Sequence, residues 1–348
     1  MVLKPFPKVT IIIPHWNGEE ILRRCLLSLR RTRYPEYRIL VVDNGSEDGS
    51  IPRIRKQFPE ADMIHSEKNI GFAAGCNLGI CSSDSPYVVL LNNDTEVTAG
   101  WLSPMVQAME QDVSIAGAQP KLLSIRDRKQ FDYCGAAGGE MDIFGYPFAW
   151  GRIFDYREKD HGQYDTQKTI FWASGAATLL RRTVLDTVGL MDEKFFAHME
   201  EIDLNWRMQM AGYRIVSVPQ AVVYHQTGAT LHEKRIRKMV LNHRNSLMMI
   251  IKNYSMLTLM WLLPLRLILE GLTILAFLFK GQPKRSLSVI LGLGGILVNG
   301  KSILKNRRQA QKIRRMNDTQ LMRRMYRGSI ALMHYLKGIQ ETGRLHFK

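Results

Sequence analysis

The sequence has few cysteines, and its regularly spaced glycines do not form a phosphate loop of a familiar type. Gly71, Gly75 and Gly79 match neither G-x-G-x-x-G nor the Walker A pattern, which argues against a dinucleotide-binding or P-loop site. The four cysteines show no paired metal spacing, which argues against a zinc module. No secretory segment precedes the first predicted strand, so we expect reduced, mostly buried thiols in a cytosolic protein.

Positive charge is scarce in the first two thirds of the chain and concentrated in the last third. Residues 1–232 carry 25 lysines and arginines against 28 aspartates and glutamates. From Glu233 to the end there are 23 basic residues and only 4 acidic ones. A near-neutral body with a strongly basic tail predicts an anionic surface as partner. No nucleic-acid motif accompanies the charge, so we favour a membrane over nucleic acid.

Long hydrophobic runs are also rare, and residues 255–279 form the only one of about bilayer length. Arg266 and Glu270 interrupt it, at a spacing that allows them to pair on one helix face. A second run, 287–298, is too short to span alone, and the stretch 301–327 is basic. We expect apolar helices that lie in or dip into a membrane leaflet, fixed by the basic stretch. A single span stays open, and the alternative is a solvated helical subdomain.

The chain does have the alternating strand and helix patterns of an α/β fold. Short apolar runs at 9–13, 39–42 and 87–91 read as strands, and a helical pattern covers 19–31. The run at 87–91 is apolar without alternation, as in a strand buried on both faces of a parallel sheet. Together these segments predict a βαβαβ nucleotide-binding half.

Three polar residues, Asn92, Asn93 and Asp94, end the strand at 87–91. Ligands of open α/β sheets bind at the carboxyl ends of the strands. A carboxylate flanked by amides suits a hard divalent cation that is shared with a phosphate-bearing ligand. The alternative interpretation is an ordinary turn, in which Asn and Asp are common.

Two further features of the first half have both a functional and a structural interpretation. Asp43 ends the second predicted strand, where an Asp often accepts hydrogen bonds from a nucleoside, but it equally suits a helix cap. Glycines at 71, 75 and 79 would share one helix face. They would allow either close approach to a diphosphate or simple packing of the helix on the sheet.

The second half begins with an irregular stretch, residues 124–168, in which we expect pocket-shaping loops and hairpins. Residues 171–180 read as a strand with a small-residue centre. Three carboxylates, Glu200, Glu201 and Asp203, then begin a helix. They complement the helix dipole, or they place a general base over a substrate. His225 ends the last predicted strand.

In this order the segments resemble a family 2 glycosyltransferase of the GT-A fold, and most of all its bacterial rhamnosyltransferase-like branch. The resemblance covers residues 8 to about 250. Its motifs are Val9-Thr10-Ile11-Ile12-Ile13-Pro14 with Asn17, Val41-Val42-Asp43-Asn44-Gly45-Ser46, Asn69-Ile70-Gly71-Phe72 with Asn77, Leu90-Leu91-Asn92-Asn93-Asp94-Thr95, Gly189-Leu190-Met191-Asp192-Glu193, Glu200-Glu201-Ile202-Asp203-Leu204, and Val223-Tyr224-His225 with Gly228-Ala229-Thr230.

The resemblance implies a role for each matching residue. Asp94 and His225 would bind Mg²⁺ or Mn²⁺. Glu201, next to Glu200, would be the catalytic base. The nucleotide-sugar donor would be held by Pro14, Asn17, Asp43, Gly71, Asn77, Asn92 and Asn93. The family usually has an acid where Asn92 stands and Asp where Glu201 stands.

The resulting expectation has two domains, residues 1–230 for catalysis and 231–348 for membrane association. The reaction would be inverting transfer of a sugar from a nucleotide diphosphate to a hydroxyl of a glycan acceptor, itself lipid-linked, during cell-surface polysaccharide assembly. The setting would be the cytoplasmic face of a bacterial inner membrane with an anionic surface. Alternatives are a membrane-bound nucleotide-sugar binding protein with a degenerate site, which Asn92 favours, and a sugar nucleotidyltransferase.

Overall fold

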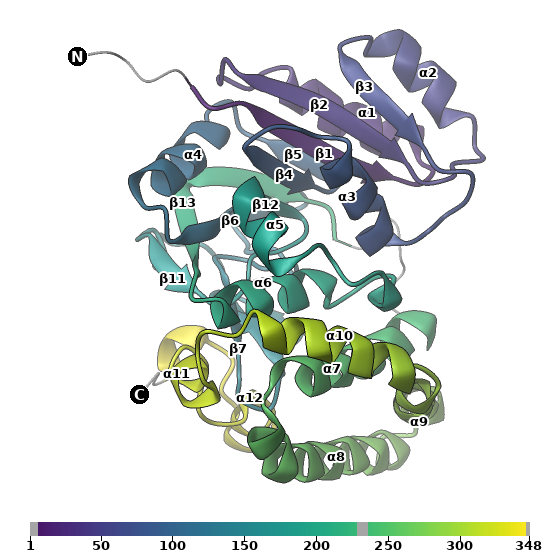
Figure 1. Ribbon diagram of the computed structural model, residues 1–348, viewed down its shortest axis with the longest axis vertical. Helices are drawn as coiled ribbons and strands as arrows, with labels where there is room; N and C mark the ends of the chain where they lie inside the picture. Colours follow the sequence, from purple (N-terminus) through teal and green to yellow (C-terminus); the bar gives the residue numbers. More distant parts are fainter. Residues whose placement is uncertain (1–5, 228–235, 346–348) are drawn as a thin grey trace.

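The computed structural model describes residues 6–227 and 236–345, and within them one large mixed sheet organises the chain (Figure 1). Its strand order is β11-β13-β6-β12-β4-β1-β2-β3, with β5 paired to β13. The strands are β1 (Val9–His15), β2 (Tyr37–Asp43), β3 (Ala61–His65), β4 (Tyr87–Leu91), β5 (Thr95–Val97), β6 (Ile115–Ser124), β11 (Lys168–Ile170), β12 (Ala177–Arg181) and β13 (Arg214–His225).

The strands β3, β2, β1 and β4 run parallel and form the half predicted from the sequence. Val88, Val89 and Leu90 of β4 are fully buried, as expected for a strand covered on both faces. The carboxyl ends of β1, β2 and β4 therefore meet at one edge of the sheet, and the polar residues that follow each of them are brought together there.

The other half of the sheet is mixed, and here one prediction was wrong. Residues 171–180 do not form a continuous strand, because only Ala177–Arg181 pairs with β4 and β6. The chain turns at Ser174–Ala176, where the amide of Ser174 donates to Gln119. A Cβ on Gly175 would lie 3.2 Å from the Phe72 ring and 3.7 Å from Cβ of Glu201, so the small centre accommodates neighbouring side chains rather than a ladder.

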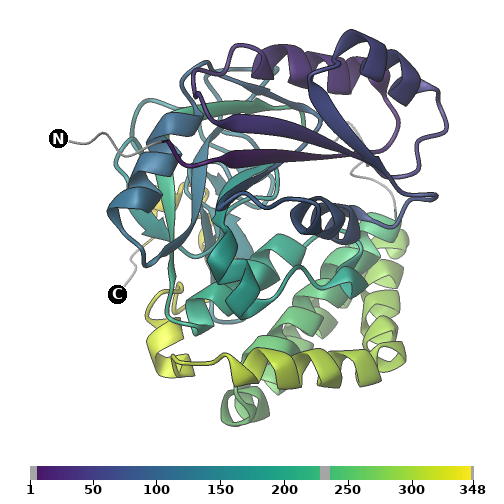
Figure 2. The same ribbon diagram turned by 45° about the horizontal axis from the view of Figure 1, so that its top comes forward.

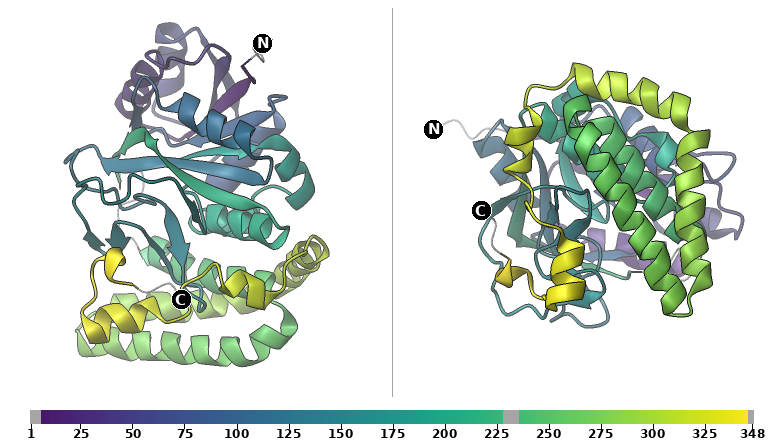
Figure 3. Two further views of the ribbon diagram at one scale, coloured as in Figure 1. Left: turned by 90° about the vertical axis from the view of Figure 1, so that its left-hand side faces the viewer. Right: turned by 90° about the horizontal axis from the view of Figure 1, so that it is seen from below.

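The irregular stretch at 124–168 contains a small antiparallel sheet of four strands, as the expectation of hairpins implied. The strands are β7 (Gly139–Met141), β8 (Pro147–Ala149), β9 (Arg152–Ile153) and β10 (Tyr156–Arg157). Pairing is antiparallel throughout, in the order β10-β9-β8-β7. This sheet lies between the main sheet and the last helices (Figure 3).

Helices cover both faces of the main sheet and create two separate cores. One core joins the sheet to α1 (Glu19–Leu29), α2 (Ser50–Gln57) and α4 (Leu102–Gln111), the other to α3 (Phe72–Cys81), α5 (Arg182–Val188) and α6 (Glu200–Met210). Figure 2 shows α1 and α3 on opposite sides of β1 and β2. A Cβ on Gly79 would lie 2.3 Å from Ile12, so this glycine serves the packing of α3 on the sheet.

The remaining chain is helical and packs beneath α6 (Figure 1). Its helices are α7 (Ile236–Asn253), α8 (Met256–Phe279), α9 (Pro283–Val298), α10 (Gly300–Lys312), α11 (Asp318–Met322) and α12 (Ile330–Lys337). A single 3₁₀ turn follows at Thr342–Arg344, and another, Glu193–Phe195, precedes α6. A third core joins Ile202 and Trp206 of α6 to Met248 and Ile250 of α7. The predicted division at 230/231 falls outside the described residues, and the segments on its two sides share this core.

Candidate active site

A cavity of about 490 Å³ lies at the carboxyl ends of β1 and β4, beside the start of α6. Most of the predicted site residues line it: Pro14, Gly71, Asn92, Asn93, Asp94, Glu200, Glu201 and His225. The described lining does not include Asn17, Asp43 or Asn77. The carboxylate predicted to bind a cation and the one predicted to accept a proton therefore face the same space.

The turn after β4 presents Asn92, Asn93 and Asp94 to this cavity. Thr95 fixes the turn by donating from its hydroxyl to the Asn92 carbonyl at 2.7 Å. The amide Nδ2 of Asn93 lies 2.8 Å from Nδ1 of His15 on β1. Within the described chain, the buried atoms Oδ1 of Asn92 and Oδ1 of Asp94 have no hydrogen-bond partner. Among the described residues the Asn92 oxygen is thus left without a partner at the wall of the cavity, and the Asp94 oxygen faces only His225.

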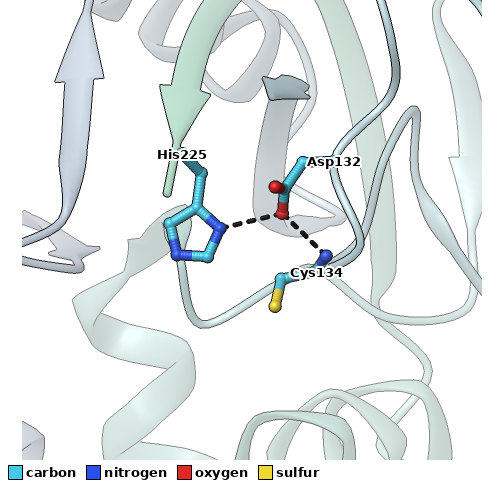
Figure 4. A group of neighbouring side chains, drawn as sticks. All are labelled: Asp132, Cys134 and His225. Carbon is cyan, nitrogen blue, oxygen red and sulfur yellow. Dashed lines mark hydrogen bonds and ion pairs between the residues drawn. The ribbon is translucent and has the colours of Figure 1, made fainter. Parts of the chain in front are cut away.

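His225 reaches the same place from the end of β13, which pairs here with β5. Its Nε2 lies 3.0 Å from Oδ1 of Asp94, so the two side chains form an ion pair when the ring is protonated. Its Nδ1 lies 2.8 Å from Oδ1 of Asp132 (Figure 4). Burial alone would lower the pKa of His225, but the charges of Asp132 and Asp94 outweigh it and hold this pKa well above its usual value.

Asp132 orients His225 and is itself fully occupied. It accepts hydrogen bonds from the Cys134 amide and from the Thr227 hydroxyl, each at 2.8 Å. A carboxylate on one ring nitrogen of a histidine typically fixes the ring so that the other nitrogen can bind a metal. No local pattern around Asp132 predicted this contact, because Asp132 lies 93 residues from His225 in an irregular loop.

The donor atoms at this wall fit a divalent cation. Asn92 and Asp94 offer an amide oxygen and a carboxylate oxygen, and His225 would offer its imidazole Nε2 once a cation displaces the proton that this nitrogen shares with Asp94. Asp132, Cys134 and His225 also have ligand atoms within 4.8 Å of one another. We favour the Asp94 set, because Asp132 is satisfied by its own donors and does not line the cavity in the described chain.

Elsewhere in the lining, Glu200 and Glu201 begin α6 after a strained turn. Phe196, His198 and Met199 all have positive φ angles, of 64°, 70° and 73°. Non-glycine residues adopt such angles only where the surroundings enforce them. Here Nδ2 of Asn245 on α7 lies 2.8 to 3.0 Å from the carbonyl oxygens of Phe195, Ala197 and His198. A residue of α7 therefore holds the turn that aims the two glutamates.

The three carboxylates at the start of α6 differ in their partners. Asp203 is buried and accepts hydrogen bonds from Arg207, Lys252 and Asn253, so its role is structural. Its ion pair with Arg207, four residues further along the helix, is 3.1 Å long. Oε2 of Glu200 and Oε2 of Glu201 are buried without a partner in the described structure. Of the three carboxylates at the start of α6, only those of Glu200 and Glu201 are available to a ligand.

Burial perturbs both glutamates. It raises the pKa of Glu201 to about 7. It raises the pKa of Glu200 further, well above the usual value, because the neighbouring charge of Glu201 also opposes its ionisation. A carboxylate with a pKa near neutrality is suited to general-base chemistry.

Some of the residues predicted to bind the nucleotide line the cavity, and others bond to neighbouring parts of the protein instead. Asp43 is buried beside the cavity edge, where it accepts from the Ser46 amide at 2.9 Å and lies 2.7 Å from Nδ1 of His65. Asn17 accepts from the Glu47 amide, which ties the loops after β1 and β2 together.

Asn77 bonds in both directions with the Met191 backbone, an arrangement that locks the loop before α6 against α3. Gly71, by contrast, lines the cavity with a φ of 90°, and a Cβ there would lie 2.6 Å from the Phe196 ring. The described residues thus give Asn77 a packing role and Gly71 a place in the wall.

Other lining residues were not predicted from the sequence: His15, His198, Arg237 and Lys238. Burial lowers the pKa of His15 and that of His198 to about 4, so both rings are neutral at pH 7. Arg237 and Lys238 begin α7 and add positive charge at the cavity. The motif residues Gly228, Ala229 and Thr230 lie outside the described residues.

Comparison with known proteins agrees with this architecture. A curated relative of 27% identity over 271 residues, 72% of this chain and 85% of the other, is the N-acetylglucosaminyl-diphospho-decaprenol L-rhamnosyltransferase of Mycobacterium tuberculosis. The O-antigen biosynthesis protein RfbC of Myxococcus xanthus is also 27% identical, over 64% of this chain but only 18% of that protein.

Among solved structures, that of GalNAc-T7 with UDP, GalNAc and Mn²⁺ superimposes with a TM-score of 0.56 at 14% identity. The superposition covers 73% of this chain and 49% of that one, and it shows a shared fold. Residues 10–189 match the profile of Glycosyl transferase family 2, which is more than half of the chain. The protein therefore belongs to glycosyltransferase family 2 and has the GT-A fold.

Proposed function

We propose that this glycosyltransferase transfers its sugar with inversion, with Glu201 as the catalytic base and with a divalent cation at Asp94 and His225. The observation that carries the proposal is the shared cavity. Asp94 and Glu201 come from elements more than a hundred residues apart in the sequence. Both nevertheless line one space of about 490 Å³; in the described chain Oε2 of Glu201 has no hydrogen-bond partner, and Oδ1 of Asp94 faces only His225. A cavity of this size matches a small-molecule site.

In the proposed reaction Glu201 accepts the proton of an acceptor hydroxyl. The hydroxyl oxygen forms a bond to the anomeric carbon of the donor, and the bond from that carbon to the nucleoside diphosphate breaks. One displacement of this kind inverts the anomeric centre and requires a single base. Burial and the charge of Glu201 raise the pKa of Glu200, which favours the neutral form of Glu200 beside the base.

The donor's diphosphate would lie against the wall formed by Asn92, Asp94 and His225. When bound there, Mg²⁺ or Mn²⁺ would neutralise the charge that develops on the leaving group. Asp132 holds His225 with Nε2 directed at that wall. Pro14, Gly71 and Asn93 would line the donor's path as further parts of the same cavity.

The acceptor and the location of the enzyme belong to the same proposal. The mycobacterial relative is named for a diphospho-decaprenol acceptor, and we infer a lipid-linked or glycan acceptor in cell-surface polysaccharide assembly here. The basic C-terminal third supports an anionic membrane surface as partner, at the cytoplasmic face of a bacterial inner membrane. We propose no nucleic-acid partner.

The experiment is a panel of labelled nucleotide sugars, incubated with membranes that contain the acceptor, with and without Mn²⁺. We expect one donor to be consumed, with transfer dependent on the cation. A nucleotide sugar that binds without being turned over would instead favour the binding protein that Asn92 makes conceivable. Release of pyrophosphate from a sugar phosphate and a nucleoside triphosphate would indicate a nucleotidyltransferase.

A further inference from the structure

The helix α8 is the one element in the described residues that is long and apolar enough to cross a membrane by itself. Its mean hydropathy is 2.0, and only 17% of its apolar window is buried. We propose that α8, α9 and α12 lie in the surface plane of an anionic bilayer and that α8 does not span it. This inference rests on the membrane partner proposed above and fixes the orientation of the enzyme on it.

One stripe of α8 is held by the body of the protein along much of the helix. Thr258, Leu262, Arg266 and Glu270 recur every four residues and are buried. Nη1 of Arg266 donates to the Phe144 carbonyl at 2.7 Å.

Further contacts come from α7 and α11. Oε2 of Glu270 lies 2.8 Å from Nδ1 of His243 on α7. At the start of α8, Asp318 accepts from the Ser255 amide. A helix bound at these points to α7, α11 and the β7–β8 loop cannot cross a bilayer without exposing Arg266 and Glu270 to lipid.

The opposite stripe of α8 is apolar and open. Leu257, Met260, Ile268, Leu272, Leu275 and Phe279 are between 51% and 89% exposed. Apolar residues of α9 and α12 are exposed as well: Ile290, Leu291, Leu297, Val298, Leu332, Tyr335 and Leu336. The view from below in Figure 3 shows α8, α9 and α12 on the same side of the molecule. Isolated exposed apolar residues are ordinary, but a patch of this extent marks an interaction site.

The basic residues around this face indicate that it binds an anionic membrane. Lys280, Lys284 and Arg285 are exposed at the turn between α8 and α9, and Lys301 and Lys305 are exposed on α10. Nζ of Lys280 lies 5.7 Å from the centre of the Tyr335 ring, so the basic turn borders α12. An apolar face bordered by lysine and arginine is typical of helices that lie in the headgroup region of anionic bilayers.

This orientation also relates the bilayer to the active site. Gly292 and Gly295 of α9 pack closely on Val240, His243 and Arg244, in the part of α7 that follows the cavity residues Arg237 and Lys238. The apolar end of α9, Leu297 and Val298, lies just beyond this contact. An acceptor anchored in the leaflet would therefore reach the cavity from the membrane side.

The first test measures cosedimentation of the full chain with vesicles of phosphatidylcholine, alone or with about one third phosphatidylglycerol. We expect binding to the anionic vesicles, weakened by salt. The double variant Ile268→Glu/Leu275→Glu should bind at least about tenfold more weakly. Leu27→Glu/Val113→Glu, which changes two exposed apolar residues of the catalytic body in the same way, should bind as the parent does.

The second test distinguishes a helix α8 that lies in the plane of the bilayer from one that spans the bilayer. Spin labels are placed at Leu257→Cys, Ile268→Cys and Leu275→Cys in a Cys81→Ser background, since Cys81 is the exposed native thiol. The Cys81→Ser protein alone measures any labelling of Cys134. In-plane binding places all three labels at one shallow depth, whereas a span places Ile268 near the bilayer centre and overturns the proposal.

A lack of vesicle binding, or self-association through this face in its place, also overturns the proposal. Donor consumption with a water-soluble acceptor is measured on the same samples. Vesicle binding without donor consumption would contradict the proposed reaction and leave this inference standing.

Discussion

Two regions support the candidate active site: the strands β1, β2 and β4, and the helices α7 to α10. Sequence motifs identify the first region as part of a site but not the second. The strands carry short motifs that can be interpreted one at a time, and each places a polar residue at the same sheet edge. The helices carry no catalytic motif, yet Asn245 and Lys252 of α7 contact the segment that presents Glu200 and Glu201. The comparison teaches that the polar residues at the strand ends can be found from local motifs, whereas the support of the catalytic base comes from residues that are distant in the sequence.

The largest expected effect tests the base itself. Glu201→Gln removes the proton acceptor and should lower the rate of transfer by about 10²–10⁴-fold. Donor affinity should not change, because the wall at Asp94 is untouched. Single-turnover kinetics together with donor titration measure both quantities.

The matched control for this variant is Glu200→Gln, which replaces a neighbour whose neutral form is favoured by burial. It should retain far more activity. Equal losses in the two variants would contradict the assignment of Glu201.

The second prediction tests the support that α7 gives to α6. Nζ of Lys252 lies 2.9 Å from Asp192 and 2.7 Å from Asp203, and all three side chains are nearly fully buried. Lys252→Ala leaves buried carboxylates with fewer partners and should destabilise the fold by about 3–5 kcal/mol.

Urea unfolding measures this loss of stability. Lys305→Ala removes an exposed lysine of the neighbouring helix α10. It should change the unfolding free energy by less than about 0.5 kcal/mol.

The third prediction is that a rise in pH has opposite effects on the stability of the fold and on enzyme activity. Because burial raises the pKa of Glu201 from 4.5 to about 7, the folded protein binds more protons than the unfolded chain between these values. Stability should therefore fall as the pH rises through this window. Glu201→Gln removes that dependence, so it should stabilise the protein by about 2–3 kcal/mol at pH 8 and by little at pH 5.

The activity of the parent enzyme should instead rise through the same window, as the base ionises. Urea unfolding midpoints at the two pH values, together with a kcat/KM profile, measure both trends. A Glu201→Gln variant that is no more stable than the parent at pH 8 would show that Glu201 is not held in its neutral form by burial.

The smallest effect concerns the strained turn. Asn245→Leu keeps the side-chain size and removes the donor to the carbonyls of Phe195, Ala197 and His198. We expect a loss of about 1–3 kcal/mol in stability and a lower kcat, with an unchanged affinity for the donor.

Asn299→Leu is the control, because Asn299 also donates to a backbone carbonyl but lies at the end of α9. It should leave kcat unaltered. A fall in donor affinity for Asn245→Leu, without a fall in kcat, would contradict a positioning role.

Much of the fold could be predicted because its signals are local. The unbroken apolar run of β4, the helix start at Glu200 and the pair of Arg266 with Glu270 each depend on neighbours within a few residues. The bend at Ser174–Ala176 was missed because a run of small apolar residues has the same composition in a strand and in a turn.

Two site contacts were beyond prediction for a different reason. Asp132 meets His225 across 93 residues, and Asn245 meets His198 across 47. Neither contact leaves a pattern in its own segment, because the partners are brought together by tertiary packing alone.

The central claim is that Asp94 and Glu201 act on one sugar from two sides of one cavity. The most direct measurement is a crystal structure with Mn²⁺ and the nucleotide sugar that the labelled panel selects. We predict an anomalous Mn²⁺ peak next to Oδ1 of Asp94 and Nε2 of His225, with the anomeric carbon between that ion and the Glu201 carboxylate. A sugar bound away from Glu201, or Mn²⁺ bound away from Asp94, would contradict the account.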